Sequence, residues 1–149
     1  MNTTMSRFGY PETLVAEYTH WAVLLRPQQV SLGSLVLVST SEATAFSELD
    51  ATQFIELRDV IEHIEGTLGA AFKYQKLNYL MLMMVDPHVH FHVIPRYADK
   101  ARWEELVFID HGWPGPPDLS RVNETGSAIN ARLVRQLRER WPLTHGETE

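Results

Sequence analysis

The segment His88–Ile94, with the sequence HVHFHVI, constrains the fold of this chain more than any other segment. Histidines alternate strictly with apolar residues there, and residues two apart point to the same face of a β-strand. The pattern predicts a strand with three imidazoles on one face and apolar side chains on the other. Thr, Lys and Glu are the usual polar residues on such a face, so this row of histidines indicates a chemical site.

Two strands and a helix are predicted upstream of the histidines. Aromatic and branched residues predict strands at His20–Leu25 and Leu35–Val38, joined by a loop around Gln28–Gly33. A capping box at Asp50 begins the clearest helix, in which apolar residues recur at steps of three and four. This stripe consists of Phe54, Leu57, Ile61, Ile64, Leu68 and Ala71.

The run Leu77–Val85 is almost uniformly apolar. It predicts a strand covered on both faces or a buried helical segment, because periodicity alone does not separate the two. The Asp86-Pro87 dipeptide breaks the run just before the histidines, so we expect an antiparallel hairpin. A short strand at Glu105–Ile109 and a final helix follow. The helix is marked by Ile129, Leu133, Leu137 and Trp141 and is stopped by Pro142.

Composition limits the class of protein. A length of 149 residues predicts a single domain over residues 1–149. The absence of cysteine excludes a disulfide framework, a cysteine nucleophile and a thiolate metal site. The formal net charge of −6 argues against binding to a nucleic-acid backbone. Because neither an export signal nor an apolar run of membrane-spanning length occurs, we expect a cytoplasmic protein that has no membrane partner.

Two kinds of chemistry use a row of imidazoles. Histidine binds transition metals, but the outer two residues of the row lie roughly 13 Å apart on a straight strand, so all three cannot bind one ion. Neutral imidazole also attacks phosphorus well and leaves well, which divides a nucleotidyl transfer into two easier steps. Such a nucleophile needs one ring nitrogen fixed as N–H, and a backbone carbonyl can do this. We therefore favour nucleophilic catalysis over a metal site.

The segment His88–Ile94, followed by Pro95-Arg96, resembles the signature of the histidine triad (HIT) superfamily. The resemblance covers roughly residues 21–96, including the Gly33 turn and the amphipathic helix. It implies an α+β, HIT-like fold with an antiparallel sheet, usually paired across a homodimer. Together with the elements predicted above, this makes a sheet of about five strands, one long amphipathic helix and a C-terminal helix.

The resemblance also implies a nucleotide hydrolase or transferase that acts on the α-phosphate. His90 would be the nucleophile that forms a nucleotidyl-histidine intermediate. His88 would orient it, largely through its backbone carbonyl, and His92 would bind the phosphate. The Pro95-Arg96 ending resembles the dinucleoside-polyphosphate hydrolase branch, so a dinucleoside polyphosphate is the expected substrate. Mg²⁺ would accompany that substrate, and no cofactor would be tightly bound.

The chain departs from the family pattern at two places. Ser34 stands where many members carry a histidine after the glycine, and no Gly-Gln phosphate-binding loop precedes His88. The candidate substrate ligands outside the triad are Arg26, Ser34, Asn78 and Arg96. Either arginine could pair with a phosphate or form a surface salt bridge instead. Asn78 interrupts an apolar run and, if buried, needs a partner for its amide.

Several alternatives stay open at the level of the sequence. The same intermediate serves a nucleotidyl transferase or phosphorylase, and the two departures are compatible with a nucleotide-binding module without turnover. A metal-site protein is the fourth reading. Trp113, which lies among prolines, would form either a lid or base-stacking wall, or an ordinary surface loop.

Overall fold

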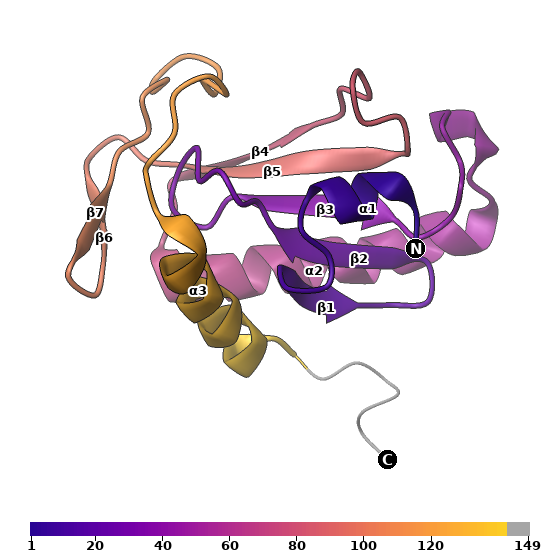
Figure 1. The fold of residues 1–149 in the computed structure, drawn as a ribbon, viewed down its shortest axis with the longest axis horizontal. Coiled ribbons are helices and arrows are strands. Elements are labelled where there is room, and N and C mark those ends of the chain that lie inside the picture. Colours follow the sequence, from indigo (N-terminus) through magenta and orange to yellow (C-terminus); the bar gives the residue numbers. More distant parts are fainter. Residues whose placement is uncertain (143–149) are drawn as a thin grey trace.

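The computed structural model describes residues 1–142 (Figure 1). A five-stranded sheet in the order β1-β2-β3-β5-β4 forms its centre, with neighbouring strands antiparallel, and β6 and β7 form a separate hairpin. The elements are α1 (Thr3–Arg7), β1 (Leu14–Glu17), β2 (Trp21–Leu25), β3 (Leu35–Ser39), the 3₁₀-helix η1 (Phe46–Glu48), α2 (Ala51–Phe72), β4 (Lys76–Leu80), β5 (His90–Arg96), β6 (Ala101–Trp103), β7 (Leu106–Phe108) and α3 (Gly126–Arg140). The predicted α+β fold with a five-stranded antiparallel sheet is confirmed.

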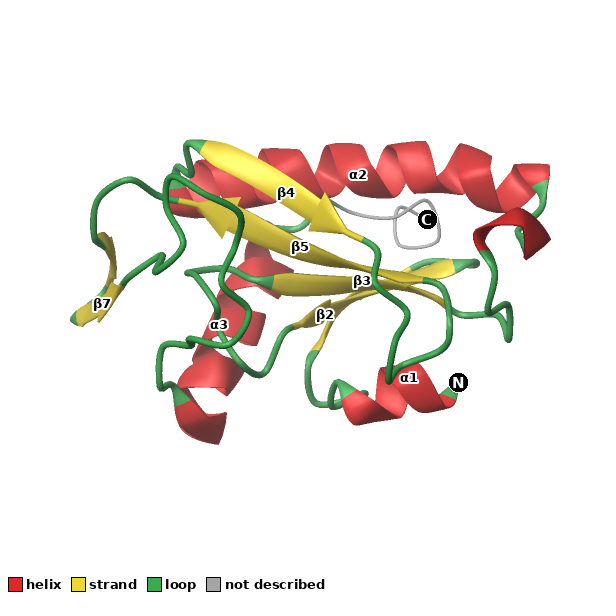
Figure 2. Cartoon of the chain, turned by 90° about the horizontal axis from the view of Figure 1, so that it is seen from above, coloured by secondary structure: helices red, strands yellow, loops and turns green. Residues whose placement is uncertain are grey.

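Helices lie against both faces of the sheet. Figure 2 shows α2 along one face and the short helix α1 against the other. Because neighbouring residues of a strand point to opposite faces, each strand contributes to two cores. The larger core joins the sheet to α2 and α3 and includes Val23, Leu35, Leu37, Ile64, Leu68, Val93, Leu133 and Leu137. The smaller core lies under α1 and consists of Met5, Phe8, Ala22, Leu24, Val36 and Val38.

Helix α2 begins where the sequence predicts. The Asp50 carboxylate accepts a hydrogen bond from the Gln53 amide at 3.1 Å, and the Gln53 side chain accepts one from the Asp50 amide at 2.8 Å. This reciprocal pair satisfies two of the free N–H groups at the helix start. Leu57, Ile64 and Leu68 of the predicted stripe are buried. Phe54, at the first turn, is 41% exposed and does not join the core.

The prediction for the run Leu77–Val85 is wrong in its second half. Strand β4 ends at Leu80 and is only partly buried, because it lies at the edge of the sheet. Beyond it, Met84 is 83% exposed and Val85 is 73% exposed. The antiparallel pairing of β4 with β5 is confirmed, but residues 81–89 connect the two strands. The run therefore ends in a surface segment rather than in a strand covered on both faces.

Strand β5 begins at His90, two residues later than predicted. The two preceding backbone amides are held outside the strand ladder. The His88 N–H donates to Thr4 Oγ1 at 3.2 Å, and the Val89 N–H donates to the Ala43 carbonyl at 3.0 Å. These bonds place His88 on the loop that leads into the strand.

The N-terminal elements and the β6 strand carry no clear signal in the sequence. Helix α1 has five residues and β1 has four, with an irregular register between Leu14 and Ala16. Strand β7 lies within the predicted strand Glu105–Ile109, and α3 ends beside Trp141 as its apolar spacing predicts. Among the described residues, no helix combines the length and apolar character needed to cross a membrane.

Candidate active site

The three triad histidines lie close together under α1. Val36 is paired with His92 and Val38 with His90 across β3 and β5, so both imidazoles share the face that α1 covers. Their ring centroids are 5.1 Å apart. His88 lies just before the strand, and all three histidines are buried.

The backbone of His88 fixes the tautomer of His90. His90 Nδ1 lies 2.7 Å from the His88 carbonyl oxygen. A carbonyl oxygen only accepts hydrogen bonds, so Nδ1 must carry the proton. His90 is 1% exposed, which shields this hydrogen bond from competing water. In the neutral ring, the lone pair is therefore on Nε2, as a nucleophilic imidazole requires.

His92 has the opposite arrangement. Arg26 Nε donates to His92 Nδ1 at 3.3 Å. A guanidinium has donors only, so Nδ1 is the acceptor and the ring proton lies on Nε2. Burial, together with the neighbouring Arg26 and His90, lowers the pKa of His92 to about 4. At neutral pH His92 is thus an uncharged N–H donor, whereas His90 beside it presents a lone pair.

Contacts from two distant segments hold the His88 ring. The ring Nδ1 lies 2.9 Å from Thr4 Oγ1, and Nε2 lies 3.1 Å from Glu42 Oε1. The Thr4 hydroxyl oxygen accepts a hydrogen bond from the His88 backbone N–H, so the hydroxyl proton of Thr4 can be donated to His88 Nδ1. The ring proton of His88 is then on Nε2, which donates to Glu42. Thr4 and Glu42 thereby fix the residue whose carbonyl orients His90. Sequence reasoning missed both because they lie 84 and 46 positions away.

Helix α1 also supplies an aromatic wall. The Phe8 ring lies 5.9 Å from the His90 ring and 5.7 Å from the His92 ring, measured between centroids. The Asn2 side chain donates to the carbonyl oxygens of Ser39 and Ser41, which anchors the start of the helix beside β3. At its other end, Arg7 Nε pairs with the Asp86 carboxylate at 2.5 Å. The segment before the triad is therefore held by α1.

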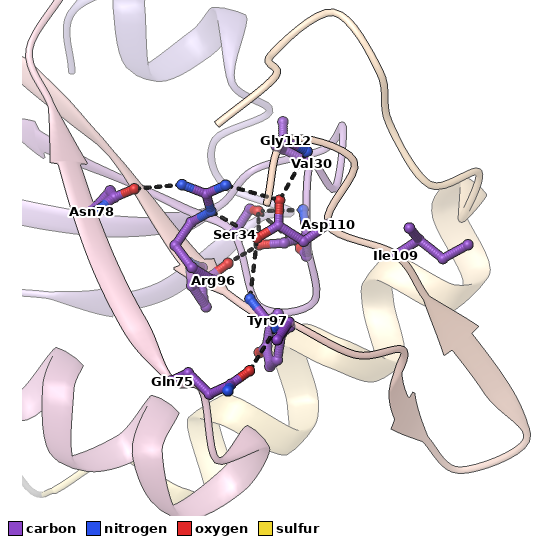
Figure 3. Close-up of polar contacts among 12 residues, drawn as sticks. Val30, Ser34, Gln75, Asn78, Arg96, Tyr97, Ile109, Asp110 and Gly112 are labelled. Carbon is purple, nitrogen blue, oxygen red and sulfur yellow. Dashed lines mark hydrogen bonds and ion pairs between the residues drawn. The ribbon is translucent and has the colours of Figure 1, made fainter. Parts of the chain in front are cut away.

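Arg96 and Asn78 contact each other at the far end of β5 (Figure 3). Arg96 donates to both carboxylate oxygens of Asp110, at 2.7 and 3.1 Å, and to Asn78 Oδ1 at 2.8 Å. Burial raises the pKa of Asp110, but hydrogen bonds from Arg96 and the Tyr97 amide outweigh burial and hold that pKa below its ordinary value. The charge of Arg96 is thus compensated within the protein, and Arg96 holds the Asp110 loop.

The Ser34 side chain is hydrogen-bonded within its own loop. This side chain is fully buried, and its hydroxyl donates to the Ser31 carbonyl at 2.8 Å and accepts from the Ser31 amide at 3.0 Å. The hydroxyl thus closes the loop before β3, whereas the sequence suggested that it contacts a substrate. Within residues 1–142, no cluster of three or more His, Asp or Glu side chains is arranged to hold a metal ion.

Comparison with known proteins identifies the family. The model of the HIT domain matches residues 9–99, which is more than half of the chain. The chain belongs to the HIT domain family. Members of the HIT family are in general nucleotide-binding hydrolases and transferases. No curated protein matches the chain.

Solved structures share the HIT fold. A histidine triad protein from Sinorhizobium meliloti 1021 gives a TM-score of 0.73 at 18% identity, over 94% of this chain and 95% of the other. A histidine triad protein from Marinobacter aquaeolei VT8 gives 0.73 at 19% identity, over 95% and 94%. The Plasmodium falciparum diadenosine triphosphate hydrolase in complex with cyclomarin A gives 0.64 at 11% identity, over 87% and 76%.

Proposed function

We propose that this HIT protein hydrolyses a dinucleoside polyphosphate, or a related nucleotide conjugate, through attack of His90 on the α-phosphate. The observation that carries the proposal is the 2.7 Å hydrogen bond between His90 Nδ1 and the His88 carbonyl. It leaves the Nε2 lone pair as the nucleophile and fixes the direction in which the lone pair points.

The reaction has two steps. In the first, a bond forms between His90 Nε2 and the α-phosphorus, and the bond from that phosphorus to the bridging oxygen breaks. The leaving group departs with the electron pair as a nucleotide or polyphosphate. In the second, water attacks the same phosphorus, the P–N bond breaks, and a nucleoside monophosphate and a proton are released. The His88 carbonyl stabilises the positive charge of the nucleotidylated ring through Nδ1–H.

Two donors beside His90 support the phosphate-binding part of this proposal. His92 offers Nε2–H, because Arg26 Nε occupies its Nδ1. Arg26 uses Nε and Nη1 for hydrogen bonds within residues 1–142, where Nη2 has no partner and is available for a phosphate oxygen. Donors of this kind strengthen as charge develops on the transferred group. They compensate for the absent Gly-Gln loop, and Mg²⁺ would bind with the polyphosphate rather than on the histidines.

Product analysis by liquid chromatography tests this function. The wild type, His90→Ala and the control His20→Ala would be incubated with diadenosine polyphosphates, nucleotide sugars, phosphoramidates and adenylyl sulfate, with and without Mg²⁺. We expect nucleoside monophosphate from the wild type and from His20→Ala, and a rate at least about 10³-fold lower from His90→Ala. Release of a nucleoside diphosphate only when phosphate is added would indicate a phosphorylase. Nucleotide binding without any product would contradict the proposed hydrolase.

We also propose a homodimer in which a second copy covers the free edge of β4. That edge has no partner strand among the described residues. The segment that follows it exposes Leu82, Met84 and Val85, which no part of residues 1–142 covers. A second copy would supply that cover. Light scattering after size exclusion should give a dimer for the wild type and a monomer for Met84→Glu, and a monomeric wild type would contradict the proposal.

A further inference from the structure

A hollow of about 330 Å³ lies at the end of β5 opposite His90. It is lined by Lys76, Asn78, Arg96, Trp113, Pro114, Gly115 and Pro116. None of the triad histidines lines it, so it is distinct from the site around His90 and His92.

The hollow and the histidines lie along the same face of the sheet. Leu80 is paired with His92 and Lys76 with Arg96. Lys76 lies four residues before Leu80, an even number, so it points to the same side as Leu80 and His92. Arg96 follows His92 by four residues on β5, which places it roughly 13 Å away along the strand. This distance is comparable with the length of a short polyphosphate chain and its ribose.

The loop that carries Trp113 has a fixed shape. Asp110, which is held by Arg96, accepts a hydrogen bond from the Gly112 amide at 3.2 Å (Figure 3). The Gly115 amide donates to the Gly112 carbonyl at 2.7 Å. A Cβ atom at Gly112 would collide with the Pro116 carbonyl oxygen, so the close return of the chain needs glycine. The wall of the hollow is therefore preformed.

The side chains of the hollow suit a nucleoside that carries phosphate. Trp113 offers a ring on which a base can stack. Within the described part of the chain, the Asn78 side chain bonds only through Oδ1, to Arg96, so its amide N–H groups are left for a base edge or a ribose hydroxyl. Lys76 is exposed and pairs with no carboxylate in residues 1–142, so its ammonium is available to bridging phosphates.

We propose that this hollow binds the distal nucleoside of a dinucleoside polyphosphate, with its base on Trp113 and its phosphates beside Lys76. The inference rests on the proposed function, because the proximal α-phosphate must lie at His90 for the second nucleoside to reach the hollow. The inference favours dinucleoside polyphosphates over the other nucleotide conjugates that the proposed function allows, because a nucleotide without a second nucleoside would leave the hollow empty.

The test compares diadenosine triphosphate with ATP, which has the same triphosphate but no second nucleoside. The readout is the ratio of kcat/KM for the two substrates. Trp113→Ala should lower this ratio about 5-fold to 160-fold, because it removes base stacking. Trp113→Phe should retain most of the ratio, and Lys100→Ala, an exposed lysine outside the hollow, should not change it. An unchanged ratio in Trp113→Ala would overturn the inference while leaving the hydrolase proposal intact.

Absence of product from both substrates with the wild type would instead refute the proposed function. The hollow is then tested by calorimetric titration of the wild type and Trp113→Ala with the same two nucleotides. Tighter binding of diadenosine triphosphate than of ATP, with the difference lost in Trp113→Ala, would support the inference. Equal affinities of the wild type for the two nucleotides would overturn it.

Discussion

Replacing Arg26 by methionine should raise the pKa of His92. The ordinary value is 6.5 and the value in the folded protein is about 4, a difference of 2.5. Burial is the largest cause and Arg26 the second, so the guanidinium accounts for less than half of this difference. We therefore expect Arg26→Met to raise the pKa of His92 by about one pH unit and to leave it below 6.5.

The assay is an NMR titration of the histidine rings between pH 3 and pH 8. Comparison with His92→Gln assigns the resonance of His92 among the seven histidines of the chain. Arg102→Met is the matched control, because Arg102 is an exposed arginine on β6. A pKa of His92 near 6.5 in the wild type, or one that Arg26→Met leaves unchanged, would refute the assignment of His92 as a neutral N–H donor held by Arg26.

Three further predictions concern stability and positioning. His92 should lower the free energy of unfolding by about 2 kcal/mol as pH drops from 6.5 to 4, because the unfolded chain binds a proton at His92 before the folded protein does. In urea unfolding at a series of pH values, the free energy of unfolding should depend less steeply on pH in His92→Gln than in the wild type. Asp110→Asn should cost about 3 kcal/mol in urea unfolding, since it leaves the buried Arg96 charge uncompensated, and the double variant Arg96→Met/Asp110→Leu should recover much of the loss. Thr4→Val should lower kcat about tenfold or more with little change in KM, because the His88 ring loses a support; equal effects on kcat and KM in steady-state assays would contradict this role.

The sequence predicted best what depends on local periodicity. The alternation around His90 and the capping box at Asp50 each determine an element from neighbouring residues alone. The apolar run from Leu77 gave a wrong prediction because apolar composition indicates burial but does not identify the covering surface. Among the described residues, β4 has a neighbouring strand on one side only.

Contacts between segments that are distant in the chain could not be predicted from the sequence. Glu42 reaches His88 only because the chain returns to that loop after β3, and nothing in its neighbourhood marks it. Arg96 was a candidate for either a phosphate contact or a salt bridge, and the structure places the Asp110 carboxylate against its guanidinium. Ser34 likewise bonds to Ser31, within its own loop.

The central claim is a covalent nucleotidyl-His90 intermediate. The most direct measurement is intact-protein mass spectrometry after brief reaction with diadenosine triphosphate and an alkaline quench, followed by peptide mapping of the adduct. The account predicts a mass increase of one adenylyl group, located on His90 and absent from His90→Ala, during turnover by the wild type. Rapid turnover with no adduct, or an adduct on another residue, would contradict it.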